Sequence, residues 1–346
     1  MSVVLVTGGA GFFGSILKDR LLKDGVQVVS IDLEPDAASH ELLTVIQGDI
    51  RSVALMDLLF EKYRFEVVYH CAAILAHAVK DKNFLWTSNV DGTRIVAECA
   101  EKYGCRSIVF TSSNCLWGHG FSEPVDESVP PEPIEIYGKS KWEGEKILEE
   151  HSGGNMSVAV LRCPTIIDEG RLGLLTFLFD FIREGRKVWV VGDGSNRYQF
   201  IYAKDLVNAC LLATKIKGFR VFHVGADDVR SFREVYEEVI LRAGTSAVVK
   251  SLPRMITIMA MKIAYMLGIS PLGPYHYKMI TESFIFNTDR AKAELGWKPT
   301  MKNEDILWLA YQYYADNFDE IVNRANVSAH RQRAKMGVIR ILKWLS

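Results

Sequence analysis

The sequence lacks the features of several protein classes. Its six cysteines are scattered along the chain, at positions 71, 99, 105, 115, 163 and 210, without the short paired spacing of a zinc site or the density of a secreted disulfide scaffold. Neither sign of charge prevails, because 41 Lys and Arg stand against 42 Asp and Glu, so the charge gives no reason to expect nucleic acid. We expect reduced thiols in the cytoplasm, no disulfide and no metal.

Long hydrophobic runs are also absent. The best candidate, residues 255–269, is shorter than the roughly twenty residues of a membrane-spanning helix and contains Lys262. Strand-like residues begin at Val3, which leaves no room for a signal peptide. With 49% hydrophobic residues in 346, the composition is that of an ordinary soluble globular protein, with one large core or two smaller ones.

A glycine-rich segment follows the first apolar run. The segment reads Thr7-Gly8-Gly9-Ala10-Gly11-Phe12-Phe13-Gly14, at the point where a strand is expected to turn into a helix. The first glycine permits a tight turn, the second lets the backbone approach a pyrophosphate, and the third lets the helix lie close to the sheet. The N–H groups at the start of the helix attract phosphates. The segment predicts a dinucleotide site that includes Gly8, Gly11, Phe12, Phe13 and Gly14.

An acidic residue about twenty positions further on supports this interpretation. The second apolar run, residues 26–31, ends in Asp32, where a carboxylate can accept hydrogen bonds from the adenosine ribose. Asp32 would repel a 2′-phosphate, and the residues after it, Leu33-Glu34-Pro35-Asp36, include no arginine to neutralise one. The sequence therefore predicts NAD as the cofactor rather than NADP.

Strand-like and helix-like segments alternate through the first half of the chain. This alternation predicts an α/β protein with a Rossmann-type, doubly wound parallel sheet and helices on both faces. After Pro164 glycines break the rhythm into shorter segments, which predicts a smaller mixed substrate-binding domain. The expected parts are a NAD-binding domain over 1–163, to which 197–225 returns, a substrate-binding domain over 164–196 and 226–328, and a basic amphipathic tail over 329–346.

A tyrosine and a lysine spaced by four residues suggest the chemistry. Tyr137 and Lys141 lie on one face of a helix expected near residues 135–151, and Ser113 follows a strand that ends at the cofactor crevice. A free tyrosine has a pKa of about 10, too high for a base near neutrality. An ammonium roughly 6 Å away, at an effective dielectric constant near 20, contributes roughly 3 kcal/mol, or about two pKa units. We expect Tyr137 as the base, Lys141 as the cation that lowers its pKa and holds the nicotinamide ribose, and Ser113 as a partner of the substrate oxygen.

Taken together, these motifs and others in the same order resemble the extended short-chain dehydrogenase/reductases, and within them the NAD-dependent epimerase/dehydratases that act on nucleotide sugars. The additional motifs are Gly48-Asp49-Ile50, His70-Cys71-Ala72-Ala73, Asn89-Val90-x-Gly92-Thr93, Thr111-Ser112-Ser113, Arg162-Cys163-Pro164-Thr165 and the segment from Thr288 to Trp297. The resemblance covers most of the chain.

The resemblance assigns further residues to the cofactor site. It implies that Asp49 and Ile50 meet the adenine, that Ala72 and Ala73 flank the cofactor, and that Asn89 supports the active-site strand. It also places Ser112, Tyr137 and Lys141 at the cofactor. Each has a simpler interpretation as well: Asp49 as a turn residue, the alanines as packing and Asn89 as a helix cap.

The residues after Ser113 bear on the reaction. The 4,6-dehydratases of this family carry an Asp-Glu pair where Asn114 and Cys115 stand here, so elimination of water is disfavoured. A C4 epimerase needs only reversible oxidation by Tyr137 and NAD, and this is our leading prediction. Two alternatives stay open: a dehydrogenase or reductase of a hydroxysteroid-like or sugar substrate, and a 3,5-epimerase in which the Cys115 thiol exchanges protons. Cys115 is otherwise a small buried hydrophobic residue.

Cations for the substrate are less clear from the sequence. A nucleotide sugar or a lipid-linked sugar carries a diphosphate, for which Arg197 and Arg171 are the candidates, with Arg254 behind them. The family places its arginine one residue after Arg197, where this chain has Tyr198. We also expect Asn114 and Ser113 to contact the substrate.

The end of the chain is locally basic. From His330 onward, apolar residues fall on one helical side with Arg340 and Lys343 beside them, which suits a helix lying on an anionic membrane surface or docking on the protein or a dimer mate. The resemblance suggests a homodimer in the cytoplasm, with peripheral contact to the inner membrane surface as the further option. A regulatory module that binds NAD without turnover is the non-enzymatic alternative.

Overall fold

The structure, a computed structural model, describes residues 3–75, 81–268 and 274–323. The predicted tail, residues 329–346, lies outside these ranges.

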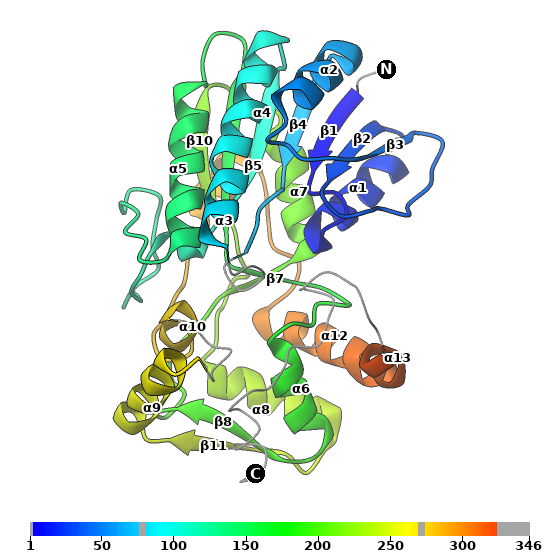
Figure 1. Ribbon diagram of the computed structural model, residues 1–346. Helices are drawn as coiled ribbons and strands as arrows, with labels where there is room; N and C mark the ends of the chain where they lie inside the picture. The colour runs from blue at the N-terminus through cyan, green and yellow to red at the C-terminus, as the bar shows by residue number, and fades with distance from the viewer. Residues whose placement is uncertain (1–2, 76–80, 269–273, 324–346) are drawn as a thin grey trace.

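A seven-stranded parallel sheet forms the first half of the molecule (Figure 1), in the order β10-β6-β5-β4-β1-β2-β3. Every neighbouring pair in it is parallel, so each connection crosses over the sheet, which the chain achieves with helices. The order reverses beside β1, and the carboxyl ends of β1 and β4 therefore border the crevice in which such folds bind ligands. The strands are β1 (Val3–Thr7), β2 (Gln27–Asp32), β3 (Leu43–Gln47), β4 (Val67–His70), β5 (Ser107–Ser113), β6 (Ser157–Cys163) and β10 (Phe219–His223).

Helices cover both faces of the sheet, because the strands carry large apolar residues on both sides. One face packs against α1 (Phe12–Lys23) and α7 (Ala203–Ala213), through side chains such as Leu17 and Leu206. The other packs against α2 (Val53–Tyr63), α4 (Asp91–Lys102) and α5 (Ile136–Glu150). Helix α3 (Lys82–Asn89) precedes α4 and was not foreseen, since its mixed polar sequence has no clear apolar stripe; a side-chain cap from Asp81 starts it. The predicted fold class is confirmed.

The second half lies beyond the carboxyl ends of the large sheet (Figure 1) and has its own aromatic-rich core. Two parallel strand pairs belong to it, β7 with β9 and β8 with β11. The strand after Arg197 was expected to return to the large sheet, but β9 pairs with β7, the short strand that follows Pro164. The elements are η1 (Asn114–Leu116), β7 (Thr165–Ile167), α6 (Leu175–Arg183), β8 (Lys187–Val191), β9 (Phe200–Tyr202), α8 (Phe232–Ala243), β11 (Val248–Leu252), α9 (Arg254–Met266), α10 (Pro274–Met279), α12 (Asn303–Asp316) and α13 (Phe318–Asn323). Helix α11 (Asp289–Leu295) instead packs against α7 and β10 of the first half.

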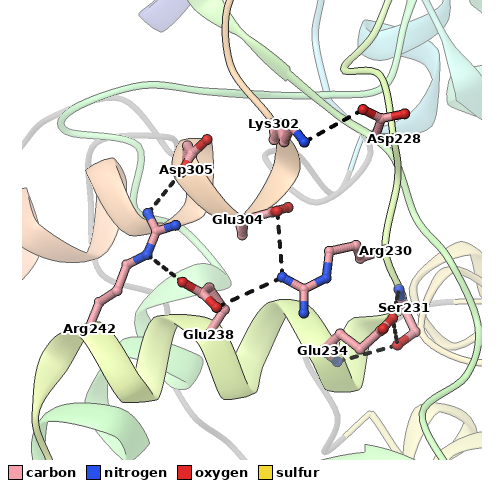
Figure 2. A network of polar contacts seen from close by, with 9 residues as sticks. All are labelled: Asp228, Arg230, Ser231, Glu234, Glu238, Arg242, Lys302, Glu304 and Asp305. Atoms are coloured by element: carbon pink, nitrogen blue, oxygen red, sulfur yellow. Dashed lines mark hydrogen bonds and ion pairs between the residues drawn. The ribbon is translucent and has the colours of Figure 1, made fainter.

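Ion pairs join α8 to α12 in this half (Figure 2). Arg242 bonds Glu238 at 2.9 Å on its own helix and Asp305 at 2.8 Å on α12. Arg230 lies 3.6 Å from Glu304 of α12 and 3.8 Å from Glu238. Such shared charges form a network, which stabilises more than isolated surface pairs do. The network supplements the apolar core that packs α12 against α8.

Candidate active site

The carboxyl end of β1 turns into α1 through the glycine-rich loop. Gly8 has φ +74°, and a Cβ on it would lie 2.8 Å from backbone atoms of Ala72, in the segment after β4. A Cβ on Gly14 would lie 2.1 Å from the carbonyl oxygen of Gly8. The close approach at Gly14 is therefore made to the loop itself, rather than to the sheet as expected. Only glycines let the loop, α1 and the segment after β4 meet this closely.

Asp32 ends β2 beside this loop. Its Oδ2 accepts a hydrogen bond from the backbone N–H of Ala10 at 3.0 Å, and its Oδ1 accepts one from Glu34 at 3.0 Å. A carboxylate has about four acceptor positions, so both oxygens retain capacity for the hydroxyls of a ribose. The loop and the acid are thus held together before any ligand binds.

Lys18 is a residue at this end of the site that the sequence analysis missed. It is buried on α1, donates from Nζ to the carbonyl oxygen of Gly9 at 3.3 Å, and forms an ion pair with Asp36. Its position four residues after Gly14, on the buried face of the helix, was the available signal. Because Asp36 neutralises this ammonium, it does not offer an unpaired charge to a 2′-phosphate.

The predicted adenine residues follow β3. Both carboxylate oxygens of Asp49 accept hydrogen bonds from the Arg51 guanidinium, at 2.6–3.1 Å, and this arginine holds the pKa of the Asp49 carboxyl below its usual value. The arginine also lies over the ring of Phe84, 4.7 Å from its centre. Ile50 packs on α4, where a Cβ on Gly92 would come within 2.7 Å of it. The roles of Asp49 and Ile50 at the adenine stay predictions.

His70 connects three elements beneath the cofactor crevice. Its Nδ1 lies 2.7 Å from the Thr7 hydroxyl and its Nε2 lies 2.8 Å from the Thr93 hydroxyl. Thr93 donates to the carbonyl oxygen of Asn89 at 2.6 Å, so it accepts from Nε2, which therefore carries the ring proton. Burial lowers the pKa of His70 to about 3, and the ring is neutral. The residue ties β1, β4 and α4 together rather than transferring protons.

Asn89 holds the segment after β4 against α5. Its Oδ1 accepts from the backbone N–H of Ile74 at 2.7 Å, and its Nδ2 donates to the Ile74 carbonyl oxygen and to Ser140, each at 3.0 Å. Ser140 in turn donates to the carbonyl oxygen of Tyr137 at 2.8 Å. Asn89 thus positions the helix that carries the predicted base, a larger role than a helix cap. Ala72, packed on Gly8, lies in the segment it holds, next to Ala73.

Lys141 is buried one turn after Tyr137 on α5. Its ammonium lies 3.9 Å from the centre of the Phe110 ring on β5, which accounts for a cation–π contact. Burial lowers the pKa of Lys141 to about 8, against the opposing effect of Cys163, Cys71 and Glu145. The ammonium therefore keeps its charge at neutral pH but holds its proton much less tightly than a lysine in water.

The phenol of Tyr137 has a raised pKa, contrary to the expectation from the sequence. Burial raises it, Cys115 and Cys163 add to the effect, and the Arg171 charge and a hydrogen bond with Ser113 lower it. Lys141 loses its proton at about pH 8, before the Tyr137 phenol ionises. Without a bound cofactor, Lys141 and Tyr137 therefore do not form an ammonium–phenolate pair. The expected lowering by two pKa units left out the burial of both groups.

Ser112 and Ser113 end β5 but have different partners. The Ser112 hydroxyl donates to the buried Glu145 carboxylate at 2.5 Å, and Glu145 also accepts two or more hydrogen bonds from Arg162, the closest at 2.7 Å. The Ser113 hydroxyl accepts from the backbone N–H of Cys115 at 3.1 Å and hydrogen-bonds Tyr137. Ser113 therefore contacts the predicted base, whereas the side chain of Ser112 belongs to a structural ion pair.

Comparison with known proteins identifies the family. The model of the NAD dependent epimerase/dehydratase family matches residues 4–225, from β1 to just past β10. The chain belongs to this family.

Members of the NAD dependent epimerase/dehydratase family and related structures resemble the chain along most of its length. The uncharacterized protein y4nG of Sinorhizobium fredii is 34% identical over 347 residues, 99% of this chain and 86% of the relative. A UDP-glucose 4-epimerase of Mycolicibacterium smegmatis is 31% identical over 253 residues, 68% of this chain and 80% of the relative. The crystal structure of a UDP-glucose 4-epimerase of Thermotoga maritima with UDP-glucose is 25% identical with a TM-score of 0.73, covering 91% of this chain and 99% of that chain.

The glycine-rich end of the site fits the cofactor of the NAD dependent epimerase/dehydratase family. The cradle left by Gly8 and Gly14, where a Cβ would collide with backbone, suits a pyrophosphate at the start of α1. Asp32 has acceptor capacity for a ribose, and Lys18 is neutralised. The cofactor is NAD. Among the described residues, no group of three or more His, Cys, Asp and Glu is arranged to hold a metal ion.

Two positions that distinguish reactions within the family lie next to Ser113. The amide of Asn114 is buried and donates to the Tyr198 hydroxyl at 2.8 Å, so it packs into the second half. Cys115 is half-buried, and its carbonyl oxygen would lie 2.1 Å from a Cβ on Gly138, the residue after Tyr137. Neither position offers a carboxylate. The thiol of Cys115 acts on the pKa of Tyr137 and is thus close to the base.

Of the two arginines predicted for the substrate, one is exposed and one lies at the site. Arg197 is exposed, and its backbone pairs with the segment around Phe284. Tyr198, where the family has an arginine, is buried, and its ring stacks on Phe232 with centres 5.9 Å apart. The Tyr198 ring therefore belongs to the aromatic core of the second half.

Arg171 lies between the two ends of the site. Its guanidinium is 5.5 Å from the centre of the Phe12 ring, at the glycine-rich loop, and its charge acts on Tyr137 and Tyr198. Burial lowers the pKa of Arg171 to about 10, so it is fully charged at neutral pH. The structure thus places this cation near the base as well as near the loop that receives phosphates. Arg171 was expected only as a ligand of the substrate.

Proposed function

We propose that the protein is an NAD-dependent epimerase that inverts C4 of the sugar in a nucleotide sugar. One observation carries the proposal: Tyr137, one turn before Lys141 on α5, hydrogen-bonds Ser113 at the end of β5, while the next two positions, Asn114 and Cys115, offer no acid–base pair. Inversion by reversible oxidation needs one proton acceptor that returns the proton it took. Elimination of water needs an additional acid and base.

Tyr137, Ser113 and Arg171 have different roles in the proposed reaction. Tyr137 accepts the proton of the C4 hydroxyl as the carbon is oxidised and returns it when the keto group is reduced. Ser113 hydrogen-bonds the same oxygen and stabilises its developing charge. NAD, held by the glycine-rich loop and Asp32, would supply the acceptor for the C4 hydride and a positive charge that favours the ionised phenol. The chain's own contribution to lowering the pKa of the phenol comes from Arg171 and Ser113.

Lys141 has two functions in this proposal. Its ammonium is charged at neutral pH and buried on the helix that also carries Tyr137. There it is suited to hold the hydroxyls of the nicotinamide ribose. Its pKa of about 8 lets it exchange a proton near neutrality, so that Tyr137 can lose its proton before the first oxidation. Asn89 and Ser140 fix the position of α5 relative to the segment after β4.

The experiment is a screen of nucleotide sugars with the purified protein, followed by proton NMR. We expect interconversion of C4 epimers without net accumulation of reduced nicotinamide, and loss of activity in Tyr137→Phe with NAD binding retained. Accumulation of reduced cofactor would instead establish a dehydrogenase. Deuterium from heavy water at C3 or C5 would establish the Cys115 reaction. A wild-type protein that never reduces its cofactor on any sugar would favour a regulatory NAD-binding protein.

A further inference from the structure

Helix α9 presents an apolar face to solvent. Of its thirteen residues only Ala264 is buried. Large apolar side chains at the spacing of three and four residues lie on one side of the helix and are all exposed; they are Met255, Ile256, Met259, Ile263, Met266 and, at the C-cap, Leu267. Such a stripe normally faces a core. Here the stripe faces outward.

The exposed apolar residues are concentrated rather than scattered. Among the described residues, seven of the fourteen exposed large hydrophobic side chains lie between Met255 and Leu267. Isolated exposed hydrophobic residues are normal, but a contiguous patch of this kind marks a binding surface. Figure 1 shows α9 at the outer margin of the second half, beside β11 and α10 and away from the large sheet. Among the described helices, none is long and apolar enough to cross a membrane.

The stretch of sequence that contains α9 is basic. Residues 239–281 include five Lys or Arg and no Asp or Glu, in a chain whose charges otherwise balance, and one of the five, Arg242, is paired with Glu238 and Asp305. Arg254 and Lys262 lie on α9 itself, both exposed, and Lys250 lies on the adjoining β11. Cations that border an apolar helix face are typical of helices in the interface of anionic membranes, where each cation near the surface adds to the attraction.

We propose that α9 docks the protein on an anionic lipid bilayer, with its apolar face among the acyl chains and its cations at the headgroups. Charge decides between this occupant and two others. Residues 321–346 contain six Lys or Arg and no acid, so the end of this chain offers no counter-charge to the cations of α9. A second copy with two-fold symmetry would bring the cations of both α9 helices into one interface, with no acidic residue on either helix to pair with them.

The docking helix is connected to the active site. Helix α9 packs against α10, where burial, Tyr265 of α9 and Glu135, two residues before Tyr137, raise the pKa of Tyr277. Lys278 of α10 donates to the carbonyl oxygen of Gly118, in the loop that follows η1. A bilayer held against α9 is therefore linked through α10 to the loop between η1 and α5. Given the proposed epimerase, a sugar joined through a diphosphate to a membrane lipid becomes an accessible substrate.

The test compares two single substitutions in the full chain. Met259 on α9 and Leu58 on α2 are equally exposed, at 60% and 59%, and both become glutamate. The probe is cosedimentation with vesicles of phosphatidylcholine alone or with about one-third phosphatidylglycerol. We expect wild type and Leu58→Glu to bind the anionic vesicles, with binding reduced by high salt, and Met259→Glu to bind at least tenfold more weakly.

Activity is measured separately on a soluble nucleotide sugar. Neither substitution touches the site, so unchanged activity and NAD binding show that each variant folds, whatever the vesicles show. If the chain proves inactive on every sugar while α9 still governs vesicle binding, the epimerase proposal fails and the docking proposal stands. The docking proposal is refuted if wild type does not bind anionic vesicles, or if Met259→Glu binds them as wild type does. A change from dimer to monomer in Met259→Glu, without vesicle binding, would assign the face to a second copy.

Discussion

Replacing Lys141 with methionine should abolish activity and yet stabilise the protein. The ammonium is 2% exposed, and burial lowers its pKa from 10.5 to about 8. A difference of 2.5 pKa units corresponds to roughly 3 kcal/mol for keeping the charge in the folded protein at pH 7. Methionine has a similar length and no charge, so we expect the free energy of unfolding to rise by roughly 2–3 kcal/mol, part of the gain being lost with the cation–π contact to Phe110.

The effect has a defined pH dependence. Between pH 8 and 10.5 the unfolded chain binds a proton at Lys141 that the folded chain does not, so the stability of wild type rises with pH across this window. Below pH 8 both states are protonated and the cost is constant. The stability difference between Lys141→Met and wild type should therefore be full at pH 7 and largely gone at pH 10. Urea denaturation of nucleotide-free protein at the two pH values measures it.

Lys139 supplies the matched control for this experiment. It lies on the same helix but is exposed, so Lys139→Met should change stability by no more than about 0.5 kcal/mol at either pH. The reasoning is refuted if Lys141→Met is less stable than wild type at pH 7, or if its stability difference from wild type is the same at pH 7 and pH 10. Either result would mean that the ammonium has interactions in the folded protein that outweigh its loss of water.

Three further substitutions test other parts of the site. Gly14→Ala should weaken NAD binding at least tenfold in a titration, because the added methyl carbon would lie 2.1 Å from the Gly8 carbonyl oxygen. Glu145→Gln should lower the free energy of unfolding by about 3–5 kcal/mol in urea, because it leaves the buried Arg162 without its counter-charge. Arg171→Gln should raise the apparent pKa of the catalytic base in the pH profile of kcat/KM by roughly one unit, with partial rescue by lysine, because it removes a cation that lowers the pKa of the phenol.

Each of these has a control in the chain. Gly244→Ala strains a glycine with φ +61° at the end of α8, where a Cβ has no neighbour within 4 Å, and should bind NAD nearly as wild type does. Glu143→Gln breaks an exposed ion pair with Lys146 on the same helix and should cost no more than about 1 kcal/mol. Arg197→Gln should leave the pH profile in place. Equal effects of any substitution and its control would contradict the explanation given for that site.

Local motifs made the first half of the fold predictable. The loop Gly8 to Gly14 and Asp32 lie close in sequence to the strands that position them, so spacing alone indicates their geometry. The strand and helix alternation indicated the parallel sheet, and the predicted helix near residues 135–151 is α5. The sequence could not show that β9 pairs with β7, because a three-residue strand has no periodicity of its own.

Interactions between distant residues made the electrostatics of the site unpredictable. The pKa of Tyr137 depends on how much water the second half excludes and on Arg171, which lies 34 positions away in sequence. The His70 contacts join residues 63 and 23 positions apart. A pairwise estimate for Tyr137 and Lys141 omitted desolvation, which is the largest effect on the pKa of each group, and the cation that lowers the pKa of the phenol is Arg171.

The position of β10 in the sheet affects folding during synthesis and the behaviour of fragments of the chain. Strand β10 is the last strand of the large sheet in sequence and pairs with β6, from Phe219↔Val158 to His223↔Arg162. The residues between the two strands, 164–218, build β7 to β9 and parts of the second half. During synthesis the outer edge of β6 has no neighbour until residue 223 has left the ribosome, and such an open edge invites pairing with other chains. A fragment cut after Cys163 would keep the nucleotide cradle but should aggregate, so the two halves have to be produced as one polypeptide.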